Sequence, residues 1–283
     1  MKELILRYLD FLTKLTLYDD PFWRAAVVDH LSSSFNRALR LFTPSPLALR
    51  HHLRSSGAII TGDFALWFIQ QFPHSWSPQI LEIVVSPEHY TSFVGNLDLL
   101  DVTVSTSGPR RPATRALGRP AYLYSHVVRC GLRSIVIYMS REDDVFAAIP
   151  RHLGTHLMNA LSADLLVVAY PALSLLNRSL YPFVMPPDYL QRQMGSYSLR
   201  GVTGVFRGSD LEDLSGGCWG SVLCAKTDRK VGDDETMVIQ IGRGNMVKDF
   251  QRVRSSVAYW RLGGKECGNS ECFLPIVHAA ADL

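Results

Sequence analysis

The residue types that can support phosphate chemistry gather around one glycine and one strand. Gly62 follows an apolar segment and precedes Asp63, and the apolar run 80–85 contains one acid, Glu82. Backbone N–H groups at a glycine turn can meet phosphate oxygens, and carboxylates are ligands that Mg²⁺ prefers. We therefore predict that Gly62 and Asp63 bind a nucleotide. We further predict that Asp63 and Glu82 are the catalytic residues of an active protein, with Glu82 as a ligand of Mg²⁺ or Mn²⁺.

The acids are fewer than this chemistry requires. In-line displacement at phosphorus uses one or two metal ions, held by two acids one residue apart on a strand and a third on a neighbouring strand. Period-two alternation would place Ile80 and Glu82 on one face, so one acid of the pair is missing. The segment 133–139 has no acid, and the nearest carboxyl groups follow it as Glu142, Asp143 and Asp144.

Asp63 and Glu82 each have a purely structural alternative. Asp63 can cap the helix expected over 64–71, since aspartate is a common N-cap residue. Glu82 can be an exposed or ion-paired strand residue. A substitute metal pair formed by Asp63 and Glu82 is the competing hypothesis.

Hydrophobic periodicity predicts the elements that would position these residues. The near-continuous apolar run at 80–85 is typical of a strand covered on both faces. The segments 121–129 and 133–139 flank Cys130-Gly131 and predict a hairpin. Further helices are expected over 22–41, 47–53, 64–71, 87–97, 150–161, 173–180 and 189–197, and further strands over 58–61, 164–170 (alternatively a buried helix), 221–224, 237–241 and 257–260.

Three other groups of residues are candidates for binding. The proline- and glycine-rich stretch 107–120 carries four arginines that can contact nucleic acid, although a solvated loop is the simpler interpretation: Arg110, Arg111, Arg115 and Arg119. Four cysteines can form a tetrahedral zinc site, and the candidates are Cys218, Cys224, Cys267 and Cys272. Their spacing is looser than that of a zinc ribbon, so the alternative is that they are reduced thiols. His152 and His156 are expected on one surface of the helix predicted over 150–161. Gly242-Arg243-Gly244-Asn245 is interpreted as a β-turn, because it lacks the third glycine of a dinucleotide loop.

Several segments resemble nucleotidyltransferase-like proteins of mushroom-forming fungi. The resemblance runs over residues 35–42 and 53–68, continues at 154–161, and includes Tyr170-Pro171 and Arg178-Ser179-Leu180. It implies a small mixed sheet of nucleotidyltransferase type with flanking helices. The chain departs from the family pattern at Asp63, where serine is usual, and at Ile80, where aspartate is usual.

Composition sets the remaining limits. The chain has 283 residues, of which 47% are hydrophobic, and this content permits a large core. Its formal net charge of +3 is too small to indicate a strong electrostatic preference for nucleic acid. Five cysteines in a chain with no evident leader favour a reduced, intracellular setting, cytoplasmic or nuclear. No run of about 20 apolar residues is present to span a bilayer.

We expect an α/β (α+β) protein with four parts. These are an N-terminal helical segment (1–50), a nucleotidyltransferase-like core (51–149), a helical part (150–205) and an irregular part with short β segments (206–283). The leading functional hypothesis is a catalytically eroded, nucleotidyltransferase-like binding module. The alternatives are an active metal-dependent nucleotidyltransferase acting on RNA, protein or a small molecule, and a cleft recast for unrelated small-molecule chemistry.

Overall fold

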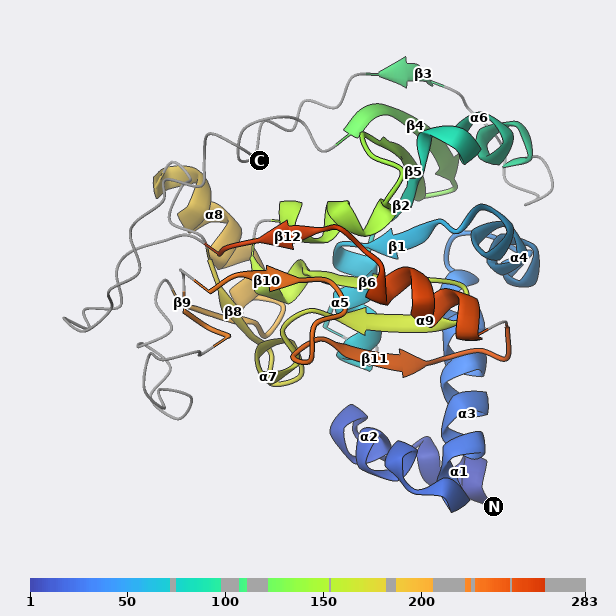
Figure 1. The fold of residues 1–283 in the computed structure, drawn as a ribbon, viewed down its shortest axis with the longest axis vertical. Helices are drawn as coiled ribbons and strands as arrows, with labels where there is room; N and C mark the ends of the chain where they lie inside the picture. The colour runs from blue at the N-terminus through green and yellow to red at the C-terminus, as the bar shows by residue number, and fades with distance from the viewer. Residues whose placement is uncertain are drawn as a thin grey trace.

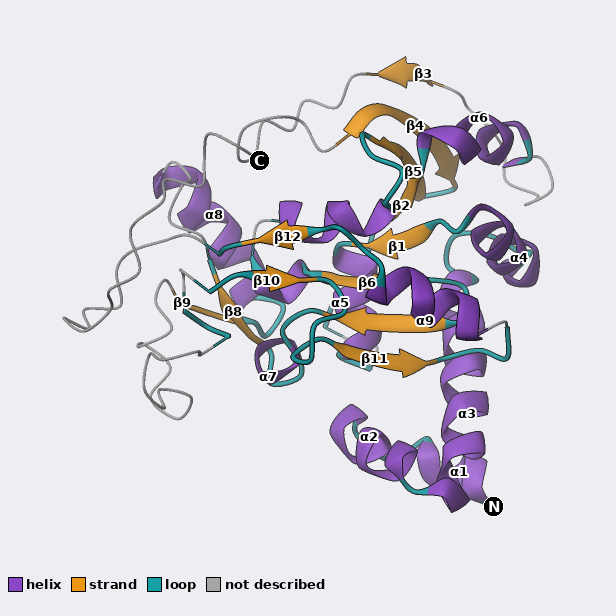
Figure 2. Ribbon diagram, viewed as in Figure 1, coloured by secondary structure: helices purple, strands orange, loops and turns teal. Residues whose placement is uncertain are grey.

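The chain is a mixed α/β protein in which helices flank one large sheet (Figures 1 and 2). The structure is a computed structural model that describes residues 1–71, 75–97, 107–110, 122–152, 154–181, 187–205, 222–224, 227–244 and 246–262. Within these residues the helices are α1 Lys2–Leu6, α2 Phe11–Asp19, α3 Pro21–Leu39, α4 Pro46–Ser56, α5 Asp63–Ile69, α6 Pro87–Gly95, α7 Pro171–Ser174, α8 Pro187–Ser198 and α9 Met246–Arg254, with 3₁₀ helices η2 Val145–Arg151 and η3 Thr155–Leu157.

The described strands form one large sheet and two small ones. They are β1 Ile59–Thr61, β2 Ile80–Val85, β3 Ser107–Arg110, β4 Tyr122–Cys130, β5 Arg133–Ser140, β6 Asn159–Leu161, β7 Leu165–Val168, β8 Arg178–Leu180, β9 Thr203–Val205, β10 Arg229–Lys230, β11 Met237–Gln240 and β12 Tyr259–Trp260. The large sheet has the order β11-β7-β6-β1-β2-β5-β4-β3. In it β2 and β5 are parallel, and the other neighbours are antiparallel. Its strands come from three of the four segments expected from sequence.

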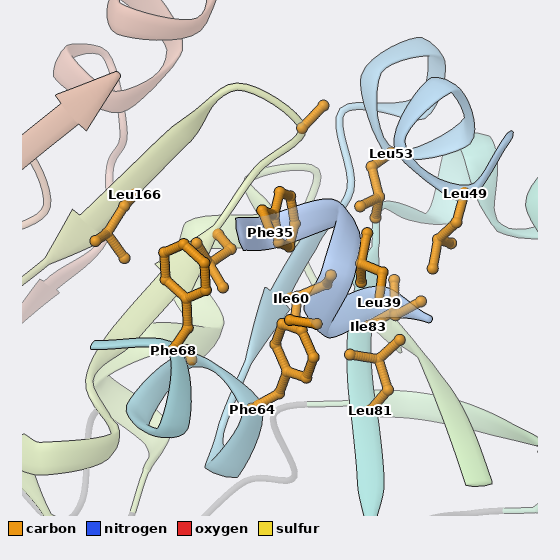
Figure 3. Packing of buried hydrophobic residues seen from close by; sticks show 14 of the residues in the cluster. Phe35, Leu39, Leu49, Leu53, Ile60, Phe64, Phe68, Leu81, Ile83 and Leu166 are labelled. Atoms are coloured by element: carbon orange, nitrogen blue, oxygen red, sulfur yellow. The ribbon is translucent and has the colours of Figure 1, made fainter. Parts of the chain in front are cut away.

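The sheet is buried on both faces, as the apolar run at 80–85 predicts. Ile60 and Ile83 pack on one face against aromatic residues of α3 and α5, including Phe35 and Phe64 (Figure 3). Ile59 and Val84, the next residues along the same strands, pack on the opposite face together with η2 and β12. Glu82 shares this second face, because period-two alternation places it with Val84 rather than with Ile83.

The region after residue 150 differs from its predicted helices. The helix expected over 150–161 is wrong: η2 ends at Arg151, η3 spans Thr155–Leu157, and β6 follows directly. The helix expected over 173–180 is replaced by the short α7 and the strand β8. The residues of β6 are all buried, so they show no alternation to mark them as a strand. The strand expected over 164–170 is confirmed by β7, and the alternative of a buried helix there is wrong. Of the strand expected over 221–224, residues 222 and 223 form a turn, residue 224 has no regular secondary structure and residue 221 lies outside the described residues.

The buried Asp164, between β6 and β7, links the large sheet to α4. The fully buried Asp164 carboxylate accepts two hydrogen bonds from Arg54, at 2.7 and 2.8 Å, and lies 3.6 Å from Arg50. Gly242 and Gly244 pass so close to Asp164 that a Cβ on either would collide with its carboxylate oxygens. The glycines of the 242–245 segment therefore have a packing role. Among the described helices, none has the length and apolar content needed to cross a bilayer.

Candidate functional site

Gly62 and Glu82 lie against each other where β1 leads into α5. Thr61 and Glu82 are direct partners across the β1–β2 pair. Gly62 has φ +71°, and a Cβ there would collide with the Glu82 carboxylate oxygen Oε2. Glycine is required for both reasons, since other residues rarely adopt this backbone conformation. The turn and the acid predicted from sequence are thus in contact.

The carboxyl group of Glu82 lies in an environment that disfavours its charge. Burial and, to a smaller extent, the negative charge of Asp63 raise the pKa of Glu82 to about 7, against the opposing effect of the hydrogen bond from the Tyr138 hydroxyl. That hydroxyl donates a hydrogen bond to Glu82 Oε1 at 3.4 Å. The Tyr122 ring stacks on Tyr138, with centroids 4.3 Å apart and planes 19° apart. Glu82, Tyr122 and Tyr138 are each half-buried, and these three residues are hereafter called the Glu82 face.

Asp63 is engaged by two residues from the segment after α7. Tyr197 donates its hydroxyl to Oδ1 at 2.8 Å, and Arg200 donates Nη1 to Oδ2 at 2.7 Å. The Arg200 guanidinium also lies over the rings of Trp76 and Tyr197, 4.9 Å from each centroid. The structural alternative, in which Asp63 caps its helix, is wrong. Gly62 occupies the cap position of α5, and no side chain closes that cap.

Two histidines lie beside this turn, in positions that the sequence did not predict. His152 follows η2 and its Nε2 bonds to Thr61 Oγ1, while burial lowers the pKa of His152 to about 4. His156 is fully buried in η3, with Nδ1 2.6 Å from Ser179 Oγ, and burial lowers the pKa of His156 to about 3. Both imidazoles are therefore neutral at pH 7. They do not share a helix surface, because no helix connects them.

The candidate third acids do not join Glu82. Asp144 caps η2 by accepting from Phe146 N–H at 3.0 Å. It also accepts from Ser256 Oγ at 2.6 Å and from Val257 N–H at 3.0 Å, so it anchors the segment before β12. Glu142 and Asp143 are exposed. Across the part of the chain that the structure describes, no group of three or more His, Cys, Asp or Glu residues could hold a metal ion.

The other predicted binding groups fall mostly outside the described residues. Arg110 belongs to β3, which pairs with β4, whereas Arg111, Arg115 and Arg119 are not described. Cys224 is half-buried. The remaining members of the predicted zinc set, Cys218, Cys267 and Cys272, also lie outside the described residues.

Sequence reasoning missed the residues that surround Glu82 and Asp63. The position of Tyr138 beside Glu82 could have been predicted. β5 runs parallel to β2 with Val136 opposite Glu82, and the residue two positions further along a strand lies on the same face. Arg200 and Tyr197 carry no local signal, because more than a hundred positions separate them from Asp63.

The arrangement offers hydrogen bonding, aromatic surface and one carboxyl group that titrates near neutrality. It contains neutral imidazoles and an acid neutralised by an arginine. Comparison with known proteins adds no assignment: no family model, no curated protein and no solved structure matches the chain.

Proposed function

We propose that the chain is a catalytically eroded, nucleotidyltransferase-like protein that acts as a binding module through the surface around Gly62, Asp63 and Glu82. The observation that carries the proposal is the pairing of Asp63 with Tyr197 and Arg200, at 2.8 and 2.7 Å. A metal ion bound by Asp63 would have to displace a charge-assisted hydrogen bond, and such bonds contribute about 1.5–3 kcal/mol. Glu82 alone is a poor ligand set for Mg²⁺, which gives up its waters reluctantly.

Active metal-dependent transfer by Asp63, Glu82 and one of Glu142, Asp143 or Asp144 has no comparable support. Asp144 is committed to Ser256 and Val257. A raised pKa for Glu82 also opposes metal binding, because a ligand carboxyl must be ionised. The resemblance of the segments around residues 35–68 and 154–180 supports the scaffold and carries no activity with it.

Manganese titration tests whether the protein lacks a catalytic metal site. Free Mn²⁺ is followed by electron paramagnetic resonance at pH 8, with each nucleoside triphosphate, in the presence and absence of protein. We expect no stoichiometric site on the protein beyond the Mn²⁺ that the nucleotide itself holds. A site that disappears in Glu82→Ala but persists in Glu88→Ala, at an exposed glutamate on α6, would contradict the proposal.

A further inference from the structure

Arg200 shows how this region of the molecule holds a cation. Its guanidinium pairs with the Asp63 carboxylate at 2.7 Å and lies 4.9 Å from the ring centroids of Trp76 and Tyr197. Tyr197 also donates its hydroxyl to the same carboxylate. A carboxylate, a tyrosine that hydrogen-bonds to it and a second aromatic ring therefore form a cation site. Aromatic rings attract cations through their negative faces.

The Glu82 face repeats this composition beside it. Tyr138 donates its hydroxyl to Glu82 Oε1, as Tyr197 does to Asp63, and Tyr122 supplies the second ring. Glu82 forms no ion pair with any described residue. The charge of Arg151 lowers the pKa of Tyr122, but it is not among the charges that shift the pKa of Glu82. The second set of groups thus has the chemistry of the first without its cation.

We propose that the Glu82 face binds a cationic group, an alkylammonium or guanidinium, which pairs with the Glu82 carboxylate and packs on the Tyr122–Tyr138 rings. This inference rests on the proposed function and specifies the ligand class of the binding module. The source of the group is either a lysine or arginine side chain of a partner protein or a free polyamine, which share this chemistry.

The surrounding charges favour a cation over a phosphate. Glu82 faces Asp63 on α5 and Tyr138 on β5. It also faces Tyr122 on β4 and Tyr197 on α8. His152, which follows η2, is neutral at pH 7 because burial lowers its pKa to about 4. The charge of Arg200 is already paired with Asp63. A triphosphate would meet two carboxyl groups there, whereas a cation would relieve the repulsion between them.

A cation that pairs with Glu82 requires the ionised carboxylate, so binding at low pH must release the Glu82 proton. The affinity should therefore depend on pH, and this dependence is the sharpest test. With a pKa of about 7, Glu82 is ionised in about a tenth of molecules at pH 6 and about nine tenths at pH 8, so affinity should rise about tenfold between these values. Neutral ligands bound elsewhere would show no such rise.

Calorimetric titration of the full chain at constant ionic strength tests the proposal. The probes are spermidine, a blocked tripeptide with central arginine, and the same tripeptide with neutral citrulline. We expect spermidine or the arginine peptide to bind about tenfold more tightly at pH 8 than at pH 6, and the citrulline peptide to bind at least tenfold more weakly at pH 8. Whichever cation binds more tightly identifies the source.

Matched variants locate the binding. Glu82→Gln keeps the shape of the side chain and should abolish the pH dependence and weaken cation binding, whereas Glu88→Gln should leave both unchanged. Tyr138→Phe keeps the ring and should retain most of the affinity, whereas Tyr138→Leu should lose it. Equal binding of the arginine and citrulline peptides, or cation binding unchanged in Glu82→Gln, would overturn the inference. That failure would leave the proposed function standing, whereas a Mn²⁺ site at Glu82 would overturn the proposed function itself.

Discussion

Replacing Glu82 with glutamine should change how the stability of the protein depends on pH. The pKa of Glu82 is raised from 4.5 to about 7, chiefly by burial and then by Asp63. The folded state therefore holds the Glu82 proton more tightly than the unfolded state does. The stabilisation is fully present below pH 4.5 and is lost as the pH rises through 7, because the folded state must then accept a poorly solvated charge.

The size of the effect follows from the two pKa values. Each pKa unit corresponds to about 1.4 kcal/mol, so the full difference is worth roughly 3 kcal/mol. Between pH 5.5 and pH 8.5, where most of the change occurs, the wild type should lose about 2 kcal/mol that Glu82→Gln keeps. Other titrating groups contribute equally to both proteins and cancel in the comparison.

Urea denaturation at intervals of half a pH unit from 5.5 to 8.5 measures this difference directly. The free energy of unfolding of Glu82→Gln minus that of the wild type should grow steadily with pH and level off above about pH 8. The exposed Glu88→Gln variant should show a flat difference. Parallel curves for Glu82→Gln and the wild type, or a difference that shrinks with rising pH, would refute the reasoning about the Glu82 environment.

Two further substitutions test the packing around the site and the sheet. Asp164→Asn should destabilise the protein by about 3–5 kcal/mol, since it removes the negative charge that faces the buried guanidinium of Arg50. Urea denaturation should show a loss of under about 1 kcal/mol for Asp29→Asn, because the ion pair of Asp29 is exposed. Gly62→Ala should cost at least about 1–3 kcal/mol through its backbone conformation, in addition to the collision with Glu82. A double-mutant cycle with Glu82→Ala should recover only the collision part, and full recovery would contradict the argument from φ.

The sequence predicts the centre of the fold better than its edges. The near-continuous apolar run of β2 and the hairpin of β4 and β5 are confirmed, because turn residues mark their ends. The helix expected over 150–161 is wrong, since apolar residues there happen to fit helical spacing while β6 is buried on every side. A strand without alternation carries no period that a sequence pattern can detect.

The candidate site could likewise be predicted from the sequence only in part. Gly62 and Glu82 stand out in the sequence because a glycine turn and a lone acid in an apolar strand are local signals, and the structure brings them into contact. The role of Asp63 was not found, because its partners Tyr197 and Arg200 come from a distant segment. Burial of His152 and the resulting fall in its pKa also depend on packing that no single segment encodes.

The most direct test of the central claim is a nucleotidyl transfer assay. The purified chain is incubated with each α-³²P-labelled nucleoside triphosphate, with Mg²⁺ or Mn²⁺, and with itself, RNA and a mixture of small-molecule acceptors. We expect no transfer above that of Glu82→Ala under any of these conditions. Metal-dependent transfer that Glu82→Ala abolishes and Glu88→Ala retains would contradict it and identify the chain as an active enzyme.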